Sequence, residues 1–447
     1  MRSTELRARA TGAVHAAVSE IGGRAVVRVD VEATERRGAL SSTASDTLAV
    51  AARTALAERL PLVVFLGSAG ADIVEGMPAL HGWGQAARAI VDCSGIVPIL
   101  FALTGPAVSG PALLLGIADQ VVMTADAYAF VSGPTMVAEF TGIVVDNDEL
   151  GGAMTHARQS GAASLVVPDT EAAEVAIADL LAYLPDHNDA EPPYWPCSDP
   201  VDRLCPEAGD LLPTLPTGSY DVRDVMAAIV DDGEVLEVRE RWAPNVVTAL
   251  ATIGGRPVGL VGNQPVAIAG TLDIPSSQKA AGFVAFCDAF NLPIVTLVDT
   301  PGFYPGKDLE WRGMIRHGAQ LVFAYGRATV PRVCVILRKS YGGAYIVMDS
   351  KRMGNDLCLA WPTAELAVMG AGQASAILMR RSTPDERAAF EADYASRLLN
   401  PYIAAERGYV DAVIEPAATR SVIASALEML GAKRERLVGR KHDNTPL

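Results

Sequence analysis

Six short runs of apolar, β-favouring residues recur along the chain, and stretches with helical character separate them. The runs cover 25–31, 62–67, 97–103, 257–263, 294–299 and 332–337. Apolar runs of this length without polar alternation are typical of strands that are covered on both faces. Their alternation with helices predicts an α/β layered architecture.

The length of the chain and a change in composition predict two domains. At 447 residues the chain exceeds what one hydrophobic core usually organises. Periodicity stops in a segment that is dense in proline and acidic residues. We therefore expect an N-terminal domain at 1–185, a linker at 186–221 and a C-terminal domain at 222–447.

Three short motifs of the first half reappear in the second half at an almost constant separation. "LGSAG" pairs with "VDTPG", "IVPIL" with "TVPRV", and "VSGPALLLG" with "YGGAYIVMD", at separations of 232, 233 and 233 residues. A constant offset over three landmarks predicts an internal duplication. Each copy would then carry a glycine-containing turn at the same place.

Charge and composition exclude several classes of partner. A formal charge of -15 disfavours a nucleic-acid or anionic membrane surface, because phosphate contacts need clustered Lys and Arg. The six cysteines form no CxxC pair, and no uninterrupted apolar segment approaches the length of a membrane span. We expect a soluble protein with reduced thiols in the cytoplasm, with neither nucleic acid nor membrane as partner.

The stretch "RKSYGGAYIVMDS" turns a buried strand directly into a helix. Glycines at such a turn let another molecule approach the backbone, whose free N–H groups can bind an anion or an oxyanion. A tight turn without a ligand is the alternative, but the duplicated position favours a site. The six histidines are dispersed, and HExxH, Walker A and GxSxG patterns are absent from the sequence. A reaction that brings its own base would suit this lack of catalytic side chains, and no metal is expected.

Longer motifs carry a resemblance to a known family. "DIPSSQKAAGFVAFCDAFNLPIVTLVDTPGFYPGKD", "GMIRHGAQ", "RKSYGGAYIVMDSKRMGNDLCLAWPTAELAVMGA" and "NPYIAAERGYVDAVI" resemble the carboxyltransferase (β) subunit of biotin-dependent acyl-CoA carboxylases, of the propionyl-CoA or acetyl-CoA type. "GADIVEG" and "TGPAVSGPALLLGIADQVV" extend the resemblance into the first half. It implies two tandem crotonase-like (ClpP/crotonase superfamily) β-β-α domains, with acyl-CoA on the N-terminal and biotin on the C-terminal one.

The resemblance also implies a reaction and its partners. The carboxyl group would move from carboxybiotin, held on a separate carrier protein, to the α-carbon of a short or branched acyl-CoA. Two backbone oxyanion holes would stabilise the biotin ureido oxygen and the thioester enolate. A biotin carboxylase with its carrier would come from other chains, since this chain would bind no biotin covalently. Members of the family form homohexamers, built as a trimer of dimers.

Matching the family motifs residue by residue gives candidate roles. The two oxyanion pairs fall on Gly343 with Ala344 and on Ser109 with Gly110. The substrate and biotin pocket would use Tyr341, Tyr345, Ile346, Phe303, Tyr304 and Gly306. The phosphates of CoA would meet Arg338, Lys339, Lys351 and Arg352, for which solvated surface charge is the alternative. An apolar Ile346, where propionyl-selective members resemble "YGGAYDVM", predicts a broad acyl range.

The first half departs from the family pattern at two places. Ser109 stands in a position that is usually glycine and is followed by Pro111, which has no N–H. Asp72 stands where the family commonly has an arginine, so a cation would be lost from the acyl-CoA side. Ser109 as a nucleophile is an alternative to its N–H acting as a donor. For Glu75 and Asp299, structural pairing is favoured over a role as a base.

Two other functions remain open from the sequence. A decarboxylase subunit could run the reverse transfer, from a malonyl-type CoA to biotin. A non-catalytic scaffold could keep the second half for assembly alone. The intact "SYGGAYIVMDS" disfavours the scaffold.

Overall fold

The computed structural model of the protein describes residues 8–34, 36–215, 217–433 and 435–446. The chain forms two compact units. Unit 1 contains the residues up to Pro193 together with 239–242 and 289–291. Unit 2 contains 194–238, 243–288 and the residues from Leu292 onward.

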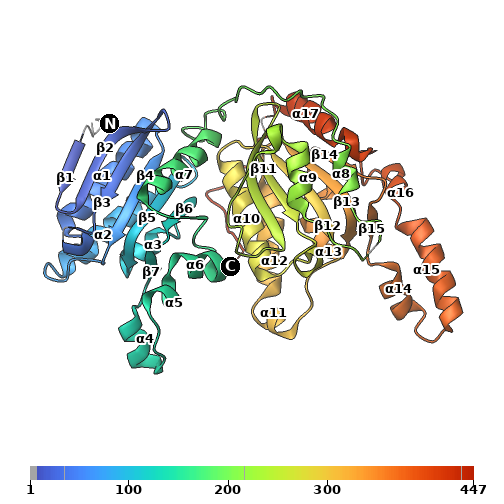
Figure 1. Ribbon diagram of the computed structural model, residues 1–447, viewed down its shortest axis with the longest axis horizontal. Coiled ribbons are helices and arrows are strands. Elements are labelled where there is room, and N and C mark those ends of the chain that lie inside the picture. The colour runs from blue at the N-terminus through green and yellow to red at the C-terminus, as the bar shows by residue number, and fades with distance from the viewer. Residues whose placement is uncertain (1–7, 35, 216, 434, 447) are drawn as a thin grey trace. The chain divides into compact units, whose positions relative to one another are not determined.

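Unit 1 is built on an eight-stranded sheet (Figure 1). The first three strands pair antiparallel and the later ones parallel. In spatial order the strands are β1 (Ala8–Thr11), β2 (Val14–Ile21), β3 (Arg24–Val31), β4 (Leu62–Ser68), β5 (Ile99–Val108), β6 (Gln120–Thr124) and β8 (Leu165–Val167), with β7 (Tyr128–Phe130) paired to the end of β5.

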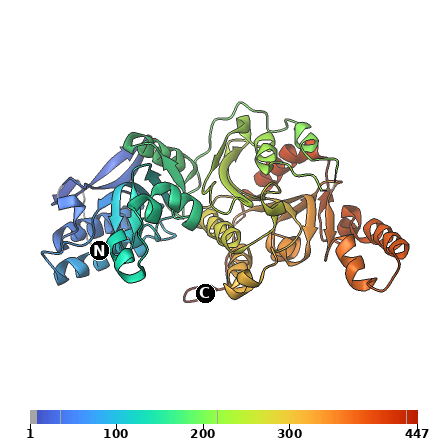
Figure 2. The ribbon, with the colours of Figure 1, turned by 60° about the horizontal axis from the view of Figure 1, so that its bottom comes forward.

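Helices cover both faces of this sheet (Figure 2). One core joins the sheet to α1 (Ser42–Glu58) and α2 (Met77–Val91). On the other face lies α7 (Thr170–Tyr183), which buries Ile177, Leu180 and Leu181. The remaining helices are short: α3 (Gly110–Leu114), α4 (Pro134–Thr141), α5 (Asn147–Gly151) and α6 (Ala153–Thr155).

Unit 2 repeats the same strand order in a second eight-stranded sheet. Its strands are β9 (Val235–Glu237), β10 (Val246–Ile253), β11 (Arg256–Asn263), β12 (Ile294–Thr300), β13 (Arg332–Tyr341), β14 (Leu357–Ala360) and β16 (Ala412–Val413), with β15 (Glu365–Ala367) paired to the end of β13. The six apolar runs of the sequence coincide with β3, β4, β5, β11, β12 and β13, although the third run begins two residues before β5, so the α/β prediction is confirmed.

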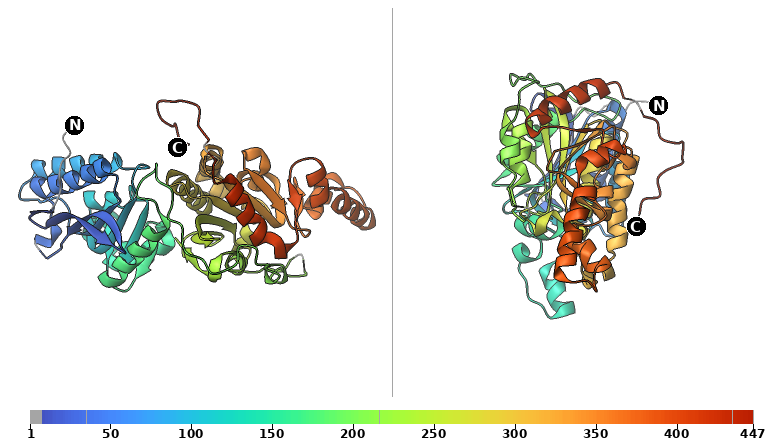
Figure 3. Two further views of the ribbon diagram at one scale, coloured as in Figure 1. Left: turned by 90° about the horizontal axis from the view of Figure 1, so that it is seen from above. Right: turned by 90° about the vertical axis from the view of Figure 1, so that its right-hand side faces the viewer.

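Two helical layers enclose the sheet of unit 2 (Figure 3). The helices α8 (Glu207–Asp210), α9 (Val222–Ile229) and α17 (Thr419–Leu430) share a core with one face. The other face carries α10 (Ile274–Ala289), whose Cys287 lies beside Gly259, and α12 (Met314–Arg327), whose Tyr325 hydroxyl is 2.9 Å from that of Thr296. The remaining helices are α11 (Lys307–Trp311), α13 (Gly342–Val347), α14 (Ala371–Leu378), α15 (Pro384–Leu398) and α16 (Pro401–Glu406).

The two sheets share an irregularity near the ends of their central strands. The β4–β5 register shifts between Leu66 and Ser68, and the β12–β13 register shifts between Val298 and Thr300. A β-bulge of this kind bends the strand and re-aims the residues that follow. In each unit it lies immediately before the strand-to-helix turn that the sequence singles out.

Neither a membrane span nor a metal cluster is found in the described ranges. No helix there is both long and apolar enough to cross a bilayer. The same residues contain no group of three or more His, Cys, Asp or Glu side chains placed to hold a metal ion.

Candidate functional site

The turn that ends β13 in unit 2 needs glycine at its first position only. Gly342 has a φ of 60°, and a Cβ on it would lie 3.1 Å from the carbonyl oxygen of Val368. Gly343 has an ordinary backbone, and the nearest atom to its Cβ position is in the ring of Phe303, at 3.7 Å. Gly342 is therefore required by the backbone, whereas Gly343 keeps a space open.

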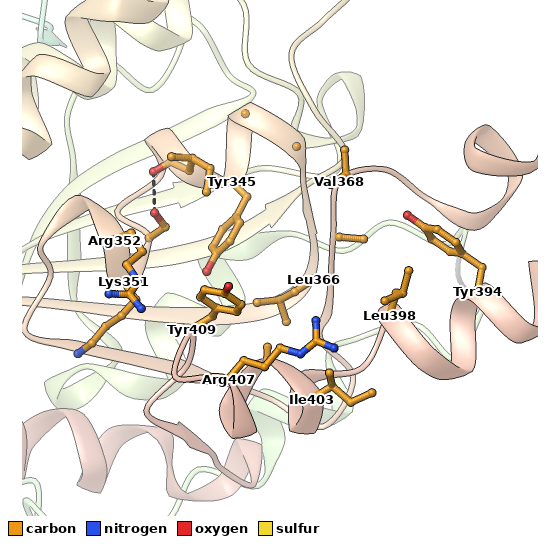
Figure 4. A pocket seen from close by; sticks show the side chains of 16 residues that line it. Tyr345, Lys351, Arg352, Leu366, Val368, Tyr394, Leu398, Ile403, Arg407 and Tyr409 are labelled. Carbon is orange, nitrogen blue, oxygen red and sulfur yellow. Dashed lines mark hydrogen bonds between the residues drawn. The ribbon is translucent and has the colours of Figure 1, made fainter. Parts of the chain in front are cut away.

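That space belongs to a pocket of about 540 Å³. Its lining is mostly apolar, and Figure 4 shows Tyr345 and Tyr409 on one side with Tyr394 and Leu398 on the other. Three basic residues, Lys351, Arg352 and Arg407, also line it. The pocket can therefore enclose an apolar ring system beside the backbone of the turn.

Most of the residues predicted for the biotin side lie at or near this pocket. Gly343, Tyr345 and Ile346 line it directly, and Ile346 keeps 44% of its surface exposed. Because the first four N–H groups of a helix have no intrahelical acceptor, those of Gly343 and Ala344 can bind an oxyanion.

The other predicted residues of this side support or flank the turn. Tyr341 is buried, and its hydroxyl donates a hydrogen bond to Glu365. Phe303 lies beside Gly343. Tyr304 and Gly306 lie on the loop between β12 and α11, where the Tyr304 side chain is exposed.

The four basic residues predicted for CoA do not form one surface patch. Arg338 is buried: its Nε donates to Asp299 Oδ2 at 3.0 Å and its Nη1 to the carbonyl oxygen of Gly218 at 2.8 Å. A guanidinium that is buried and bonded in this way cannot reach a phosphate. The placement of Arg338 thus argues against the CoA-binding role predicted for it, whereas Lys351 and Arg352 lie at the pocket.

Asp299 and Glu75 act as structural carboxylates. Asp299 also accepts from the backbone N–H of Lys339 at 3.1 Å, so it joins β12 to β13 just after the bulge. Burial raises the pKa of Asp299, and the charge of Arg338 opposes this rise. Glu75 accepts from the N–H and the hydroxyl of Ser42, both at 2.6 Å. These contacts confirm the interpretation that both carboxylates pair structurally.

Sequence reasoning missed the wall of the pocket that comes from α15, α16 and the residues after them. Tyr394, Leu398, Ile403, Arg407 and Tyr409 line it, although they follow the glycine turn by 50 residues or more. The motif "NPYIAAERGYVDAVI" carried the family resemblance, but nothing in its pattern assigns these side chains to a pocket.

The equivalent turn of unit 1 corrects the role predicted for Ser109. Ser109 follows β5 as Gly342 follows β13, and its φ of 62° matches the 60° of Gly342. Its N–H donates to the carbonyl oxygen of Phe130 at 2.9 Å. Because this N–H is already bonded, the structure does not support Ser109 as a backbone oxyanion donor. The pair equivalent to Gly343 and Ala344 is Gly110 and Pro111.

A second turn adjoins the first in unit 1. A Cβ on Gly70 would lie 3.3 Å from the carbonyl oxygen of Val108 and 3.8 Å from the Cβ of Ser109. The buried Asp72 follows this turn and pairs with Arg36, with Nη1–Oδ2 at 2.7 Å and Nη2–Oδ1 at 2.9 Å. Arg36 thus brings a guanidinium to Asp72, and the loss of a cation from the acyl-CoA side stays a prediction.

Comparison with known proteins assigns the chain to a family. Residues 1–445 match the family described as carboxyl transferase domain. The chain belongs to this family. The resemblance predicted from the sequence is thus confirmed, and with it the prediction of a carboxyltransferase enzyme.

Relatives and solved structures of this carboxyl transferase family match almost the whole chain. The propionyl-CoA carboxylase beta chain of Saccharopolyspora erythraea is 42% identical over 446 residues, which cover 96% of this chain and 82% of that protein. The methylmalonyl-CoA decarboxylase subunit alpha of Propionigenium modestum is 39% identical over 434 residues, covering 96% of this chain and 84% of that protein.

The transcarboxylase 12S crystal structure is also similar; it is described with its hexamer assembly and with methylmalonyl-coenzyme A and methylmalonic acid bound. It superimposes with a TM-score of 0.95 at 42% identity, covering 97% of this chain and 85% of that one.

Proposed function

We propose that this chain is the carboxyltransferase subunit of a biotin-dependent acyl-CoA carboxylase, which moves a carboxyl group from carrier-bound carboxybiotin to the α-carbon of a short or branched acyl-CoA. The turn at Gly342 and Gly343, open to an apolar pocket of about 540 Å³, carries this proposal within a carboxyl transferase fold.

The pocket of unit 2 suits biotin. The fused rings of biotin are largely apolar and would pack against Tyr345, Ile346 and Tyr409. The ureido oxygen would then accept hydrogen bonds from the N–H groups of Gly343 and Ala344. Backbone donors aimed at a developing charge are worth about 3 kcal/mol each, or roughly a hundredfold in rate.

Unit 1 would hold the acyl thioester. Gly110 opens helix α3 as the second residue of its turn, so its N–H would serve as an oxyanion donor there. Carboxybiotin supplies the carboxyl group and, once that group has left, the base that takes the α-proton. The residues of this chain bind the reactants, exclude water and stabilise the two oxyanions, so no side-chain base is needed.

The duplication and the crotonase-like fold belong to this proposal. The shared strand order, the bulge at the same place and the matching turns support two copies of one domain, with unit 1 on the acyl-CoA side and unit 2 on the biotin side. We also propose a homohexamer that works with a biotin carboxylase and its carrier, in line with the hexamer of transcarboxylase 12S. The location predicted from the sequence, the cytoplasm, stays a prediction.

Reconstitution tests the function directly. The chain is mixed with a biotin carboxylase, its biotinylated carrier, ATP and labelled bicarbonate, and acyl-CoAs of two to five acyl carbons are screened for fixed label. We expect label in the acyl-CoA only when the biotinylated carrier is present. The absence of fixation with every acyl-CoA, while the carrier itself becomes carboxylated, would refute the proposal.

A decarboxylase role is the second candidate, and the 39% identity to a methylmalonyl-CoA decarboxylase subunit favours it. In that case the same pocket would receive the carboxyl group on biotin. Incubation with methylmalonyl-CoA and the biotinylated carrier, without ATP, would then yield carboxylated carrier and the shorter acyl-CoA. The relative rates of the two directions decide between the candidates.

A further inference from the structure

The site turns of the two units differ at two neighbouring positions. Unit 2 reads Gly342, Gly343, Ala344, whereas unit 1 reads Ser109, Gly110, Pro111. Ser109 has φ 62° and ψ −130°, a region that glycine occupies easily and a serine only under strain. The serine is therefore held at a place where the backbone would favour glycine.

The turn of unit 1 has fewer free backbone donors than that of unit 2. The N–H of Ser109 is bonded to the carbonyl oxygen of Phe130, and Pro111 has no N–H at all. Gly110 alone keeps a donor at the place where unit 2 has both Gly343 and Ala344. An oxyanion at this turn would thus lack one of the two donors that unit 2 supplies.

The side chain of Ser109 is placed to fill that deficit. It is exposed, and its hydroxyl makes no hydrogen bond to any residue in the described part of the chain. Its Cβ lies 3.8 Å from the Cβ position of Gly70, so the side chain projects toward the second turn rather than into the core. The hydroxyl is then free to donate to a ligand at the exposed surface beside the two turns.

We infer that the Ser109 hydroxyl is a catalytic hydrogen-bond donor to the thioester oxygen of the acyl-CoA, in place of the N–H that Pro111 lacks. This inference rests on the proposed function. The hydroxyl keeps its proton and forms no bond to the acyl carbon. Its hydrogen bond strengthens as the thioester oxygen gains negative charge in the enolate, so it contributes more to the transition state than to binding.

Ser109→Gly separates the hydroxyl from the backbone. This variant relieves the strained φ, so its melting temperature should rise. Its kcat for acyl-CoA carboxylation should nevertheless fall by about 10- to 100-fold, with the KM for acyl-CoA within about twofold of wild type. Ser109→Ala should lose the same rate without the gain in melting temperature. A merely structural serine predicts instead that glycine is at least as active.

A second substitution tests the replacement itself. Pro111→Ala returns an N–H to the turn, so Ser109→Gly/Pro111→Ala should recover at least about tenfold of the rate lost in Ser109→Gly. Asp232→Gly is the matched control, because Asp232 is exposed in unit 2 with a φ of 52°. It should raise the melting temperature and leave kcat unchanged.

Three results would overturn the inference. The first is a Ser109→Gly enzyme with the kcat of wild type. The second is hydrolysis of acyl-CoA without biotin that disappears in Ser109→Ala, because the serine would then be a nucleophile. The third is a wild-type protein that carboxylates no acyl-CoA, which refutes the proposed function before any variant is made and the inference with it.

Discussion

Gly342 and Gly343 are neighbours, yet the structure predicts opposite consequences for adding a methyl group to each. At Gly343 the backbone is ordinary and the nearest atom to a new Cβ is 3.7 Å away, in the ring of Phe303. Gly343→Ala should therefore leave the free energy of unfolding unchanged or raise it by about 0.4–1 kcal/mol, through the lower entropy of the unfolded chain. At Gly342 the φ of 60° and the 3.1 Å contact with the Val368 carbonyl oxygen should cost about 1–3 kcal/mol.

The effects on catalysis should run the other way. A side chain at Gly343 occupies the pocket where the ureido group of biotin would approach the backbone. Displacement of the ureido oxygen from one donor forfeits about 3 kcal/mol, so kcat/KM for the carboxybiotin carrier should fall by about 100-fold in Gly343→Val and by less in Gly343→Ala. The KM for acyl-CoA should change little, because that substrate is assigned to unit 1.

Two measurements on the same preparations check this reasoning. Urea unfolding gives the free energy of unfolding, and labelled bicarbonate fixation at varied carrier concentration gives kcat/KM. Gly343→Val should be stable and inactive, whereas Gly342→Ala should be unstable and should keep more activity while it is folded. Normal turnover by a folded Gly343→Val would remove the biotin site from this turn.

Three further predictions concern other residues. The family resemblance places the Ile346 position on the wall between the biotin pocket and the acyl pocket, so acyl carbons would pack against its acyl side. Each methylene buried there gains about 0.8 kcal/mol, roughly fourfold in kcat/KM, so Ile346→Asp should narrow the acyl range. Unchanged ratios across acetyl-, propionyl- and butyryl-CoA would eliminate Ile346 as the selector. Burial raises the pKa of Asp349 to about 6, despite the ion pair with Arg332 at 2.6 Å. Between pH 4 and 6 the Asp349 carboxyl of the folded protein thus holds a proton that the unfolded chain has lost. The free energy of unfolding that this carboxyl contributes is fully present below pH 4 and should be lost as the pH rises through 6, by about 3 kcal/mol in all. Asp349→Asn should abolish this dependence of the free energy of unfolding on pH. Five of the six cysteines are buried and Cys197 is not, so one thiol should react with a disulfide reagent in the native protein and six after unfolding.

The strands and turns could be predicted because their signals are local. A buried strand needs only apolar β-favouring residues in succession, as in "RVCVIL", and adjacent glycines indicate the turn of unit 2. The separations of 232 and 233 residues between the halves likewise hold in the structure, where Ser109 and Gly342 both have a positive φ near 60°. Local pattern and fold agree at these places.

The contacts across the fold could not be predicted in this way. The bond from the Ser109 N–H to Phe130 depends on how β7 pairs with β5, and no sequence pattern near Ser109 indicates it. The pairing of Arg338 with Asp299 joins residues 39 positions apart in the chain, and turns a charge expected at the surface into a buried one. Partners distant in the chain decide the role of both residues.

The buried pair of unit 2 also shows how the two turns have diverged. At the places that Asp299 and Arg338 occupy in unit 2, unit 1 has Gly67 and Gly105, where a Cβ on Gly105 would lie 3.5 Å from the Cα of Gly67. A buried ion pair gains little stability over a well-packed apolar pair, because desolvation offsets the attraction. What Asp299 adds is a hydrogen bond to the Lys339 N–H beyond the bulge, where the strand ladder is interrupted.

Unit 2 thus fixes its turn through side chains and leaves the backbone donors of Gly343 and Ala344 free. Unit 1 instead closes the same space with glycines and bonds its turn through the Ser109 N–H. The donor that unit 1 lacks is the N–H absent from Pro111, and the exposed hydroxyl of Ser109 is the group that can replace it.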